Sequence, residues 1–204
     1  MAPSSERFRT FHALRIKGFA KPDVLAEIAD LDVDEVEPIL AQLQNDGLAL
    51  FREARGLWQL TPDGRARHAE ELAADLDAAV RTGLSAHYHE FLEFNHAFKA
   101  LCGDWQLRNG APNDHSDRAY DTDVVSRLAE HDRAARPVVQ AMSGVLARLA
   151  PYAPRLEHAC DRVTQGETNM FTGVMCGSYH DIWMELHEDL ILSQGIDRAA
   201  EGSF

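Results

Sequence analysis

Residues 33–65 read VDEVEPILAQLQNDGLALFREARGLWQLTPDGR. The first half carries apolar side chains at the three- and four-residue spacing of a helix, which is predicted to stop near Gly47. These side chains are Val36, Ile39, Leu40 and Leu43. The second half reads as two short strands, 48–52 and 57–60, with a helix cap at Thr61 directly after them.

Two more helices are predicted upstream. The first carries apolar side chains at Phe8, Phe11, Leu14 and Ile16. Gly18 can end this helix, and Pro22 suits the first position of the next one. Asp32 and Asp34 both offer a cap for the helix that follows. Three helices and then a β-hairpin is the order of a winged helix-turn-helix.

Two stretches of the sequence are specific enough to indicate a protein family. LAQLQNDGL at 40–48 and LTPDGR at 60–65 resemble winged-helix regulators of the MarR type. In that family a leucine-rich helix ends in Gly-Leu, a wing follows, and Leu-Thr-x-x-Gly starts the long helix used for dimerisation. The resemblance covers about residues 8–80, and it implies a winged helix that binds duplex DNA as a homodimer.

The segment that would read the DNA bases departs from this pattern. Residues 30–46 contain six acids and no Lys or Arg, and several carboxylates together repel the phosphates beside a groove. These acids are Asp30, Asp32, Asp34, Glu35, Glu37 and Asp46. Asp30 stands where such units usually carry Gly, but Asp tolerates the left-handed turn. Pro38 requires the helix to start late, near Asp34, or to kink.

Candidate DNA contacts lie around this segment. The resemblance implies that the wing residues Arg52 and Arg55 enter the minor groove, while other cations clamp the backbone. Lys17, Lys21 and Arg65 are candidates for the backbone contacts. Gln42 can read a base edge, because its amide both donates and accepts. The alternative is that these cations form a solvated face that balances nearby acids.

Charge divides the chain into two regions. The 204 residues carry 33 Asp+Glu and 20 Lys+Arg, for a net charge of −13. Residues 1–68 hold nine basic and eleven acidic side chains, a balance of −2, and residues 69–204 hold eleven and twenty-two, a balance of −11. We therefore expect a winged helix at 1–68 and an acidic helical dimerisation or ligand-sensing domain at 69–204.

The second region reads as a helical bundle, so the predicted fold class is mainly α. Helical patterns cover 62–81, 84–102, 124–136, 137–149, 154–163 and 179–193. Ser178 caps the last of these helices. Residues 103–121 lack periodicity and are predicted to form a long loop.

Composition favours a soluble, cytoplasmic protein. Hydrophobic residues make up 45% and charged residues 26%. No run approaches ~18 apolar residues, so no membrane partner is expected. The three cysteines are widely spaced, which fits reduced thiols.

One predicted helix carries candidate metal ligands. His89, Glu93 and His96 could bind one metal ion with a further ligand from the last helix, since Glu-x-x-His is a unit of di-iron bundles. In the last helix, Asp181 and Glu185 could share a cation or simply face water. No cofactor other than a metal ion is expected.

Aromatic residues offer a candidate site for a small-molecule effector. Tyr88, Trp105, Tyr179 and Trp183 could line an apolar pocket. The alternative is that these four side chains form part of the core. The same alternative is expected for His87, which lies on the apolar stripe of its helix.

No catalytic motif is found, so no enzymatic activity is expected. Two hypotheses for function follow. The first is a transcriptional regulator that binds duplex DNA and is controlled by its helical domain. The alternative is a winged-helix adaptor that does not bind DNA and whose acidic third helix contacts a basic partner.

Overall fold

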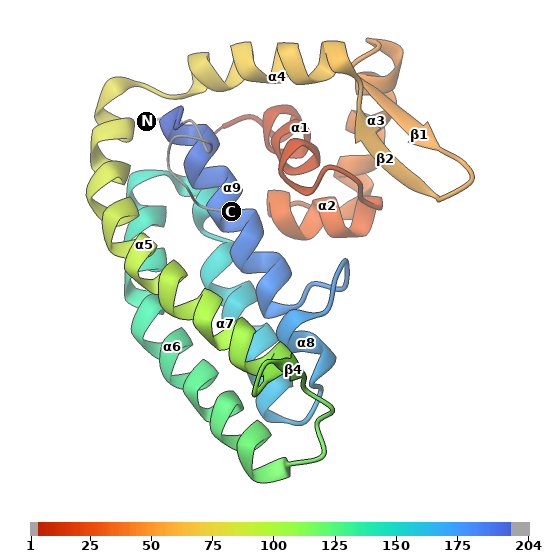
Figure 1. Ribbon diagram of the computed structural model, residues 1–204. Coiled ribbons are helices and arrows are strands. Elements are labelled where there is room, and N and C mark those ends of the chain that lie inside the picture. Colours follow the sequence, from red (N-terminus) through yellow and green to blue (C-terminus); the bar gives the residue numbers. More distant parts are fainter. Residues whose placement is uncertain (1–3, 197–204) are drawn as a thin grey trace.

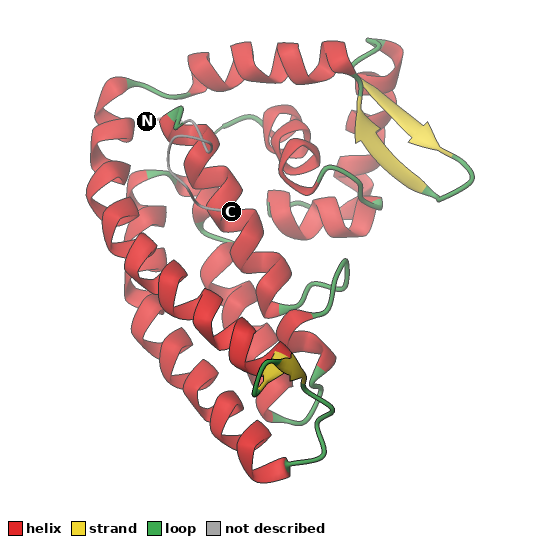
Figure 2. Cartoon of the chain, viewed as in Figure 1, coloured by secondary structure: helices red, strands yellow, loops and turns green. Residues whose placement is uncertain are grey.

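The computed structural model describes residues 4–196, which form a mainly helical fold with a small β-hairpin (Figures 1 and 2). The described residues bury two separate hydrophobic cores. One core lies among the first three helices and the hairpin, which we call the N-terminal unit. The other lies among the later helices, which we call the bundle. Both are made by the amphipathic patterns in the sequence.

Local capping sets the helices of the N-terminal unit. They are α1 (Glu6–Lys17), α2 (Pro22–Ala29) and α3 (Val33–Asn45). Gly18 ends α1 with a φ of 78°, and Asp30 adopts the left-handed conformation after α2 with a φ of 54°. Asp32 caps α3, as predicted, and it forms a capping box with Glu35. Pro38 lies inside α3 without ending it.

The hairpin consists of β1 (Ala49–Arg52) and β2 (Leu57–Leu60). They pair antiparallel, with Phe51 opposite Trp58. The backbone of Ala20 exchanges two hydrogen bonds with that of Trp58, at 3.1 and 2.8 Å. The connection between α1 and α2 is therefore tied to β2, and the hairpin projects away from the bundle (Figure 1).

Helix α4 (Pro62–Asp75) links the N-terminal unit to the bundle. The bundle contains α5 (Ala78–Gln106), α6 (Arg118–Val145), η1 (Ala147–Leu149), α7 (Tyr152–Thr164), α8 (Asn169–Thr172) and α9 (Tyr179–Gln194). Helix α5 contacts α6, α6 contacts α7, α7 contacts α9, and α9 contacts α5. These four helices thus enclose the second core, which Phe8 of α1 also joins.

Three predicted boundaries in this region were wrong. The helix predicted at 62–81 breaks at Leu76, where the backbone is extended, and Asp77 caps a new helix. The loop predicted at 103–121 is mostly ordered, because α5 continues to Gln106 and a hairpin of β3 (Leu107–Arg108) and β4 (Ala111–Pro112) follows.

The third wrong boundary lay at Pro137, where two helices were predicted. Helix α6 runs through this position as a single helix. Pro137 itself is exposed, while Ala135, Val138 and Val139 are buried in the core. Packing of these neighbours outweighs the backbone hydrogen bond that a proline cannot donate.

None of the helices within residues 4–196 has both the length and the apolar character needed to cross a membrane.

A matched pair of glycine substitutions tests how closely α4 packs on the hairpin. A Cβ at Gly64 would lie 1.9 Å from the carbonyl oxygen of Leu48, whereas one at Gly144 in α6 meets nothing within 4 Å. We expect Gly64→Ala to lower the free energy of unfolding by about 2 kcal/mol or more. Gly144→Ala should leave it unchanged or raise it by up to ~1 kcal/mol. Urea unfolding of both variants measures this; equal effects would contradict it.

Candidate functional site

The outer face of α3 is acidic and exposed. Asp34, Glu35 and Glu37 are exposed, because the opposite face of the helix is buried against the first core. That buried face carries Val36, Leu40 and Leu43. The predicted base reader Gln42 is exposed too, and its Nε2 donates to Asp46 Oδ1 at 2.8 Å. Helix α3 therefore presents carboxylates to any molecule that approaches it.

A groove separates α3 from the hairpin. We call it the α3–hairpin groove, and its volume is about 660 Å³. Its walls include Val33, Glu37 and Gln44 from α3 and Phe51, Glu53 and Trp58 from the hairpin. Val33 and Phe51 are exposed, at 37% and 39%. The charged residues of the lining are Lys21 and three acids, Asp23, Glu37 and Glu53, so the groove suits a ligand that carries both apolar groups and positive charge.

The predicted DNA contacts fall into two groups. Arg52, Arg55, Lys21 and Arg65 are exposed, the first two at the end of the hairpin. Lys17 lies instead between the N-terminal unit and α9, with its side chain 11% exposed. Its Nζ lies 2.7 Å from Glu185 and 3.6 Å from Asp181. The cation that these two acids share is therefore the Lys17 ammonium group.

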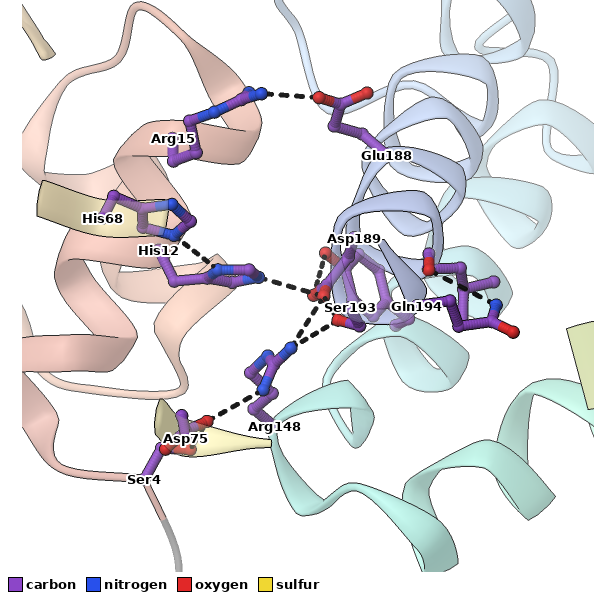
Figure 3. Close-up of polar contacts among 12 residues, drawn as sticks. Ser4, His12, Arg15, His68, Asp75, Arg148, Glu188, Asp189, Ser193 and Gln194 are labelled. Atoms are coloured by element: carbon purple, nitrogen blue, oxygen red, sulfur yellow. Dashed lines mark hydrogen bonds and ion pairs between the residues drawn. The ribbon is translucent and has the colours of Figure 1, made fainter. Parts of the chain in front are cut away.

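A buried polar cluster joins the two units, and we call it the junction network (Figure 3). It consists of His12, His68, Asp75, Arg148, Tyr152, Asp189 and Ser193. At its centre is Asp189 on α9, which is 2% exposed. One carboxylate oxygen lies 2.9 Å from His12 Nε2, and the other accepts from the Tyr152 hydroxyl at 3.2 Å.

Arg148 extends this network to α4. Its guanidinium group lies 3.4 Å from Asp189 and donates to Ser193 Oγ at 2.5 Å. It also donates to Asp75 at 3.0 Å, and Asp75 in turn accepts from Ser4 Oγ. The cation on η1 is thus balanced by carboxylates from two helices, as burial of a charge requires.

Two neutral histidines form the other arm. His12 Nδ1 lies 2.9 Å from His68 Nε2. Both contacts of His12 are satisfied when its Nε2–H points to Asp189 and His68 donates to its Nδ1. Burial is the main cause that lowers the pKa of both imidazoles, and it lowers that of His68 to about 3. Both imidazoles are therefore neutral near pH 7.

Asp189 stays ionised in this setting. Burial by itself raises the pKa of a carboxyl group, but His12 and Arg148 outweigh it and hold the pKa of Asp189 well below its usual range. The order histidine, histidine, aspartate resembles a proton relay. However, His12, His68 and Asp189 are all at most 3% exposed, so a substrate cannot reach them in this arrangement. The network couples the two units.

The predicted effector residues lie mostly in the second core. Trp105, Tyr179 and Trp183 are buried among other aromatic rings, with Trp183 stacked on Phe91 at 4.9 Å. Trp183 Nε1 donates to Asn95. Tyr88 is 3% exposed and lines a surface hollow between α5 and the end of α9. The structure does not bring the four together around one pocket that it describes, and an effector stays a prediction.

The predicted metal ligands are not grouped into a site. His89, Glu93 and His96 are exposed along α5, and His89 Nδ1 lies 2.7 Å from the Ser85 carbonyl oxygen. Across residues 4–196, no three His, Cys, Asp or Glu side chains are placed to hold one metal ion. Burial raises the pKa of Cys102 and Cys160 to about 12, so both are protonated thiols at neutral pH.

No family model, curated protein or solved structure that was compared with this chain matches it. The site must therefore be interpreted from its own residues. The sequence analysis did not single out His12, His68, Arg148 or Asp189. Asp189 offered one signal, because it falls on the same helical stripe as the buried residues Leu186 and Ser193.

A pair of charge removals on α9 tests the junction network. Asp189→Asn leaves Arg148 buried without its central partner, and we expect a loss of about 3–5 kcal/mol in the free energy of unfolding. Glu188→Gln removes the half-exposed pair with Arg15, at 3.1 Å, and should cost less than about 1 kcal/mol. Urea unfolding distinguishes these results. A small, equal loss in both variants would mean that Asp189 does not hold the junction.

Acid should destabilise the protein through its buried histidines. Burial lowers the pKa of His68 to about 3 and that of His131 to about 4, from the usual 6.5. As the pH falls below 6.5, the unfolded chain takes up these protons and the folded chain does not. We expect the free energy of unfolding to fall toward pH 4, by up to ~1.4 kcal/mol per pH unit for each such histidine.

Urea unfolding across this pH range measures the slope. Each of the variants His68→Gln and His131→Gln should reduce the slope of the free energy of unfolding against pH by the contribution of about one proton, ~1.4 kcal/mol per pH unit. Stability that stays constant from pH 7 to pH 4 would contradict the neutral state of both histidines.

Proposed function

We propose that the N-terminal unit is a winged helix that acts as a protein-interaction adaptor, and that the α3–hairpin groove binds a basic segment of a partner protein. The observation that carries this proposal is the exposed acidic face of α3 beside an apolar groove. In a winged helix, α3 is the element that meets the target, so its charge selects the class of target.

The order of elements supports the winged helix. Three helices precede an antiparallel hairpin, and the left-handed Asp30 makes the turn between α2 and α3. The isolated bridge between Ala20 and Trp58 ties the hairpin to the connection between α1 and α2, which steadies a wing on the helices. Thr61 then caps α4 by accepting from Gly64, at the position where the family resemblance places its long helix.

The cations of α1 are not free to clamp DNA. Arg7 pairs with Glu71, and Arg9 donates to the carbonyl oxygens of Ala29 and Asp30. Arg15 and Lys17 pair with acids of α9. Nonspecific DNA affinity comes from Lys and Arg that replace the counterions of phosphates, and these four side chains already have internal partners.

A basic partner fits the same surface well. Glu37 lines the groove from α3 and Glu53 lines it from the hairpin, and the lining also includes Val33, Phe51, Trp58 and the cation Lys21. A segment with a Leu or Phe side chain flanked by Lys or Arg would bury its apolar group there and pair its charges at the rim. Interfaces gain affinity from such a buried anchor and specificity from the surrounding charges.

One observation favours DNA binding as a second candidate function. Arg52 and Arg55 are exposed at the end of the hairpin, where a wing enters a minor groove. A regulator of this kind would depend on the wing alone, because α3 offers no cation.

A selected peptide tests the adaptor. The full chain is used to select binders from a displayed library of random 20-residue peptides, and the selected peptide is synthesised with a fluorophore. We expect it to contain more Lys and Arg than Asp and Glu. Asp34→Lys together with Glu37→Lys should weaken its binding by at least about tenfold in a fluorescence polarisation titration.

The matched control reverses two exposed acids of α5, as Glu90→Lys with Glu93→Lys, and should leave the affinity unchanged. A mixed-sequence DNA duplex titrated at low salt should give no complex. Failure to select any basic peptide, or equal effects of both double variants, would reject the adaptor. A duplex complex that Arg52→Ala with Arg55→Ala abolishes would favour the regulator instead.

A further inference from the structure

We propose that the junction network is a proton-sensitive switch: when His12 and His68 both take up a proton, the N-terminal unit separates from the bundle while each keeps its own core. This inference goes beyond the proposed adaptor function, because it concerns how the two units are held together and does not depend on what α3 binds. We call the separated form the open arrangement and the form described above the closed one.

Acids that the bundle presents to the junction also have partners within the bundle. Asp189 accepts from the Tyr152 hydroxyl at 3.2 Å and lies 3.4 Å from Arg148. Glu185 accepts from Arg155 of α7 at 2.7 Å. All of these partners belong to the bundle, so both carboxylates stay paired when the N-terminal unit moves away. Opening the junction therefore avoids the costly outcome, which is a buried acid without a cation.

The side chains that cross the junction from α1 can be solvated when it opens. His12, Arg15 and Lys17 of α1 all contact acids of α9. Water solvates their polar ends once α9 has moved, which offsets much of the energy of these contacts. The polar part of the junction can therefore open without unfolding either unit.

Apolar packing favours the closed arrangement at neutral pH. Phe8 of α1 and Leu72 of α4 are each 6% exposed and pack in the second core. Opening moves both side chains into water, which the hydrophobic effect opposes. A second influence must therefore act on the junction before it opens, and protons on the histidine pair supply it.

The chain connects the two units through a break at which it can turn (Figure 1). Helix α4 ends at Asp75, the backbone at Leu76 is extended, and Asp77 caps α5. Helix α4 contacts α1 and β2, and it carries His68, so we expect it to move with the N-terminal unit. A few residues at the end of an element are enough to absorb the change in φ and ψ of a hinge.

The closed arrangement cannot hold a proton on both histidines. His12 Nδ1 lies 2.9 Å from His68 Nε2, a contact in which one ring donates and the other accepts. If both rings were protonated, two N–H groups would face each other with no acceptor between them. The rings are 3% and 1% exposed, so water does not reach the charges either. Two protons on the pair therefore require the rings to leave the junction.

The charged groups that face the pair come from four elements (Figure 3): Arg15 of α1, Asp75 of α4, Arg148 of η1 and Asp189 of α9. The acids favour a proton on the pair and the arginines oppose it. Burial outweighs the acids, because it lowers the pKa of His12 and lowers that of His68 to about 3. In the open arrangement water reaches both rings, and the pKa of each returns toward 6.5.

Protons therefore bind the open arrangement more tightly than the closed one. As the pH falls below 6.5, the ratio of open to closed molecules should rise by up to about tenfold per pH unit for each histidine, or about a hundredfold for both. Above this pH neither ring binds a proton in either arrangement, so the ratio no longer depends on the pair. The junction thus responds to acid over the range in which histidine titrates.

The experiment measures a distance between the two units of the full chain at different pH values. Spin labels are attached at Ala54→Cys on the hairpin turn and Glu130→Cys on α6, which are both exposed. Cys102 and Cys176 are replaced by Ala, and Cys160 is buried. Double electron–electron resonance gives the distances, and far-ultraviolet circular dichroism gives the helicity of the same samples.

We expect one distance at pH 7. A second, distinct distance should grow between about pH 6 and pH 4 while the helicity is retained, and it should disappear when the sample returns to pH 7. A single distance at every pH at which the helicity is retained would overturn the proposal. This titration of the labelled parent protein decides the matter without any histidine variant.

Histidine variants identify the groups that take up the protons. A glutamine amide donates and accepts as a neutral imidazole does, but it binds no proton. We therefore expect His12→Gln with His68→Gln to keep one distance until the helicity is lost. The matched control is His131→Gln, because burial lowers the pKa of His131 to about 4 in the bundle, away from the junction. This control should open as the parent does.

The same pH dependence of opening in the double variant and in the parent would also overturn the proposal. If the double variant does not fold, the single variant His68→Gln replaces it. Its ratio of open to closed molecules should rise by about tenfold per pH unit instead of about a hundredfold. An unchanged slope in this variant would likewise reject the histidine pair as the switch.

Discussion

The burial of one carboxylate, that of Asp189, is the constraint on which the assembly of the two units depends. A charge at 2% exposure is tolerated because four elements bring partners to it: α1 brings His12, η1 brings Arg148, α7 brings Tyr152 and α9 itself brings Ser193. Apolar contacts build the two cores almost separately, with Phe8 of α1 as the buried side chain of the N-terminal unit that packs in the second core. Directional contacts at the junction add the specific orientation of one unit on the other.

The N-terminal unit could be predicted closely from the sequence because its signals are local. Asp32, Asp30 and Gly18 each act on a backbone only a few residues away, and the structure places each of them as a cap or turn. The bundle was predicted only as helices, with boundaries that failed at Leu76 and Pro137. At those positions the outcome depends on packing against distant helices, which outweighs the local preference of a residue.

The residues of the candidate site also divide into those that local sequence could predict and those that depend on long-range contacts. The acids of α3 could be named in advance, because the exposed face of a helix follows from its apolar pattern, and the arginines of the hairpin follow from the turn between two predicted strands. The ion pairs of Lys17 could not be predicted for a long-range reason: its partners Asp181 and Glu185 lie in the last described helix. The aromatic residues Trp105, Tyr179 and Trp183 are equally suited to a pocket or a core by composition, and only the packing of α5 against α9 decides in favour of the core.

The pairing of the first helix with α9 has a consequence for how the chain is made. Arg15 and Glu188, which pair across the junction, stand 173 positions apart. During synthesis the N-terminal unit can bury its own core early, since its contacts are short in sequence. His12 and Lys17 then lack their partners on α9 until that helix has left the ribosome. Arg15 and Lys17 of the newborn chain therefore stay without their acidic partners until α9 has been made, and the junction can close only after that.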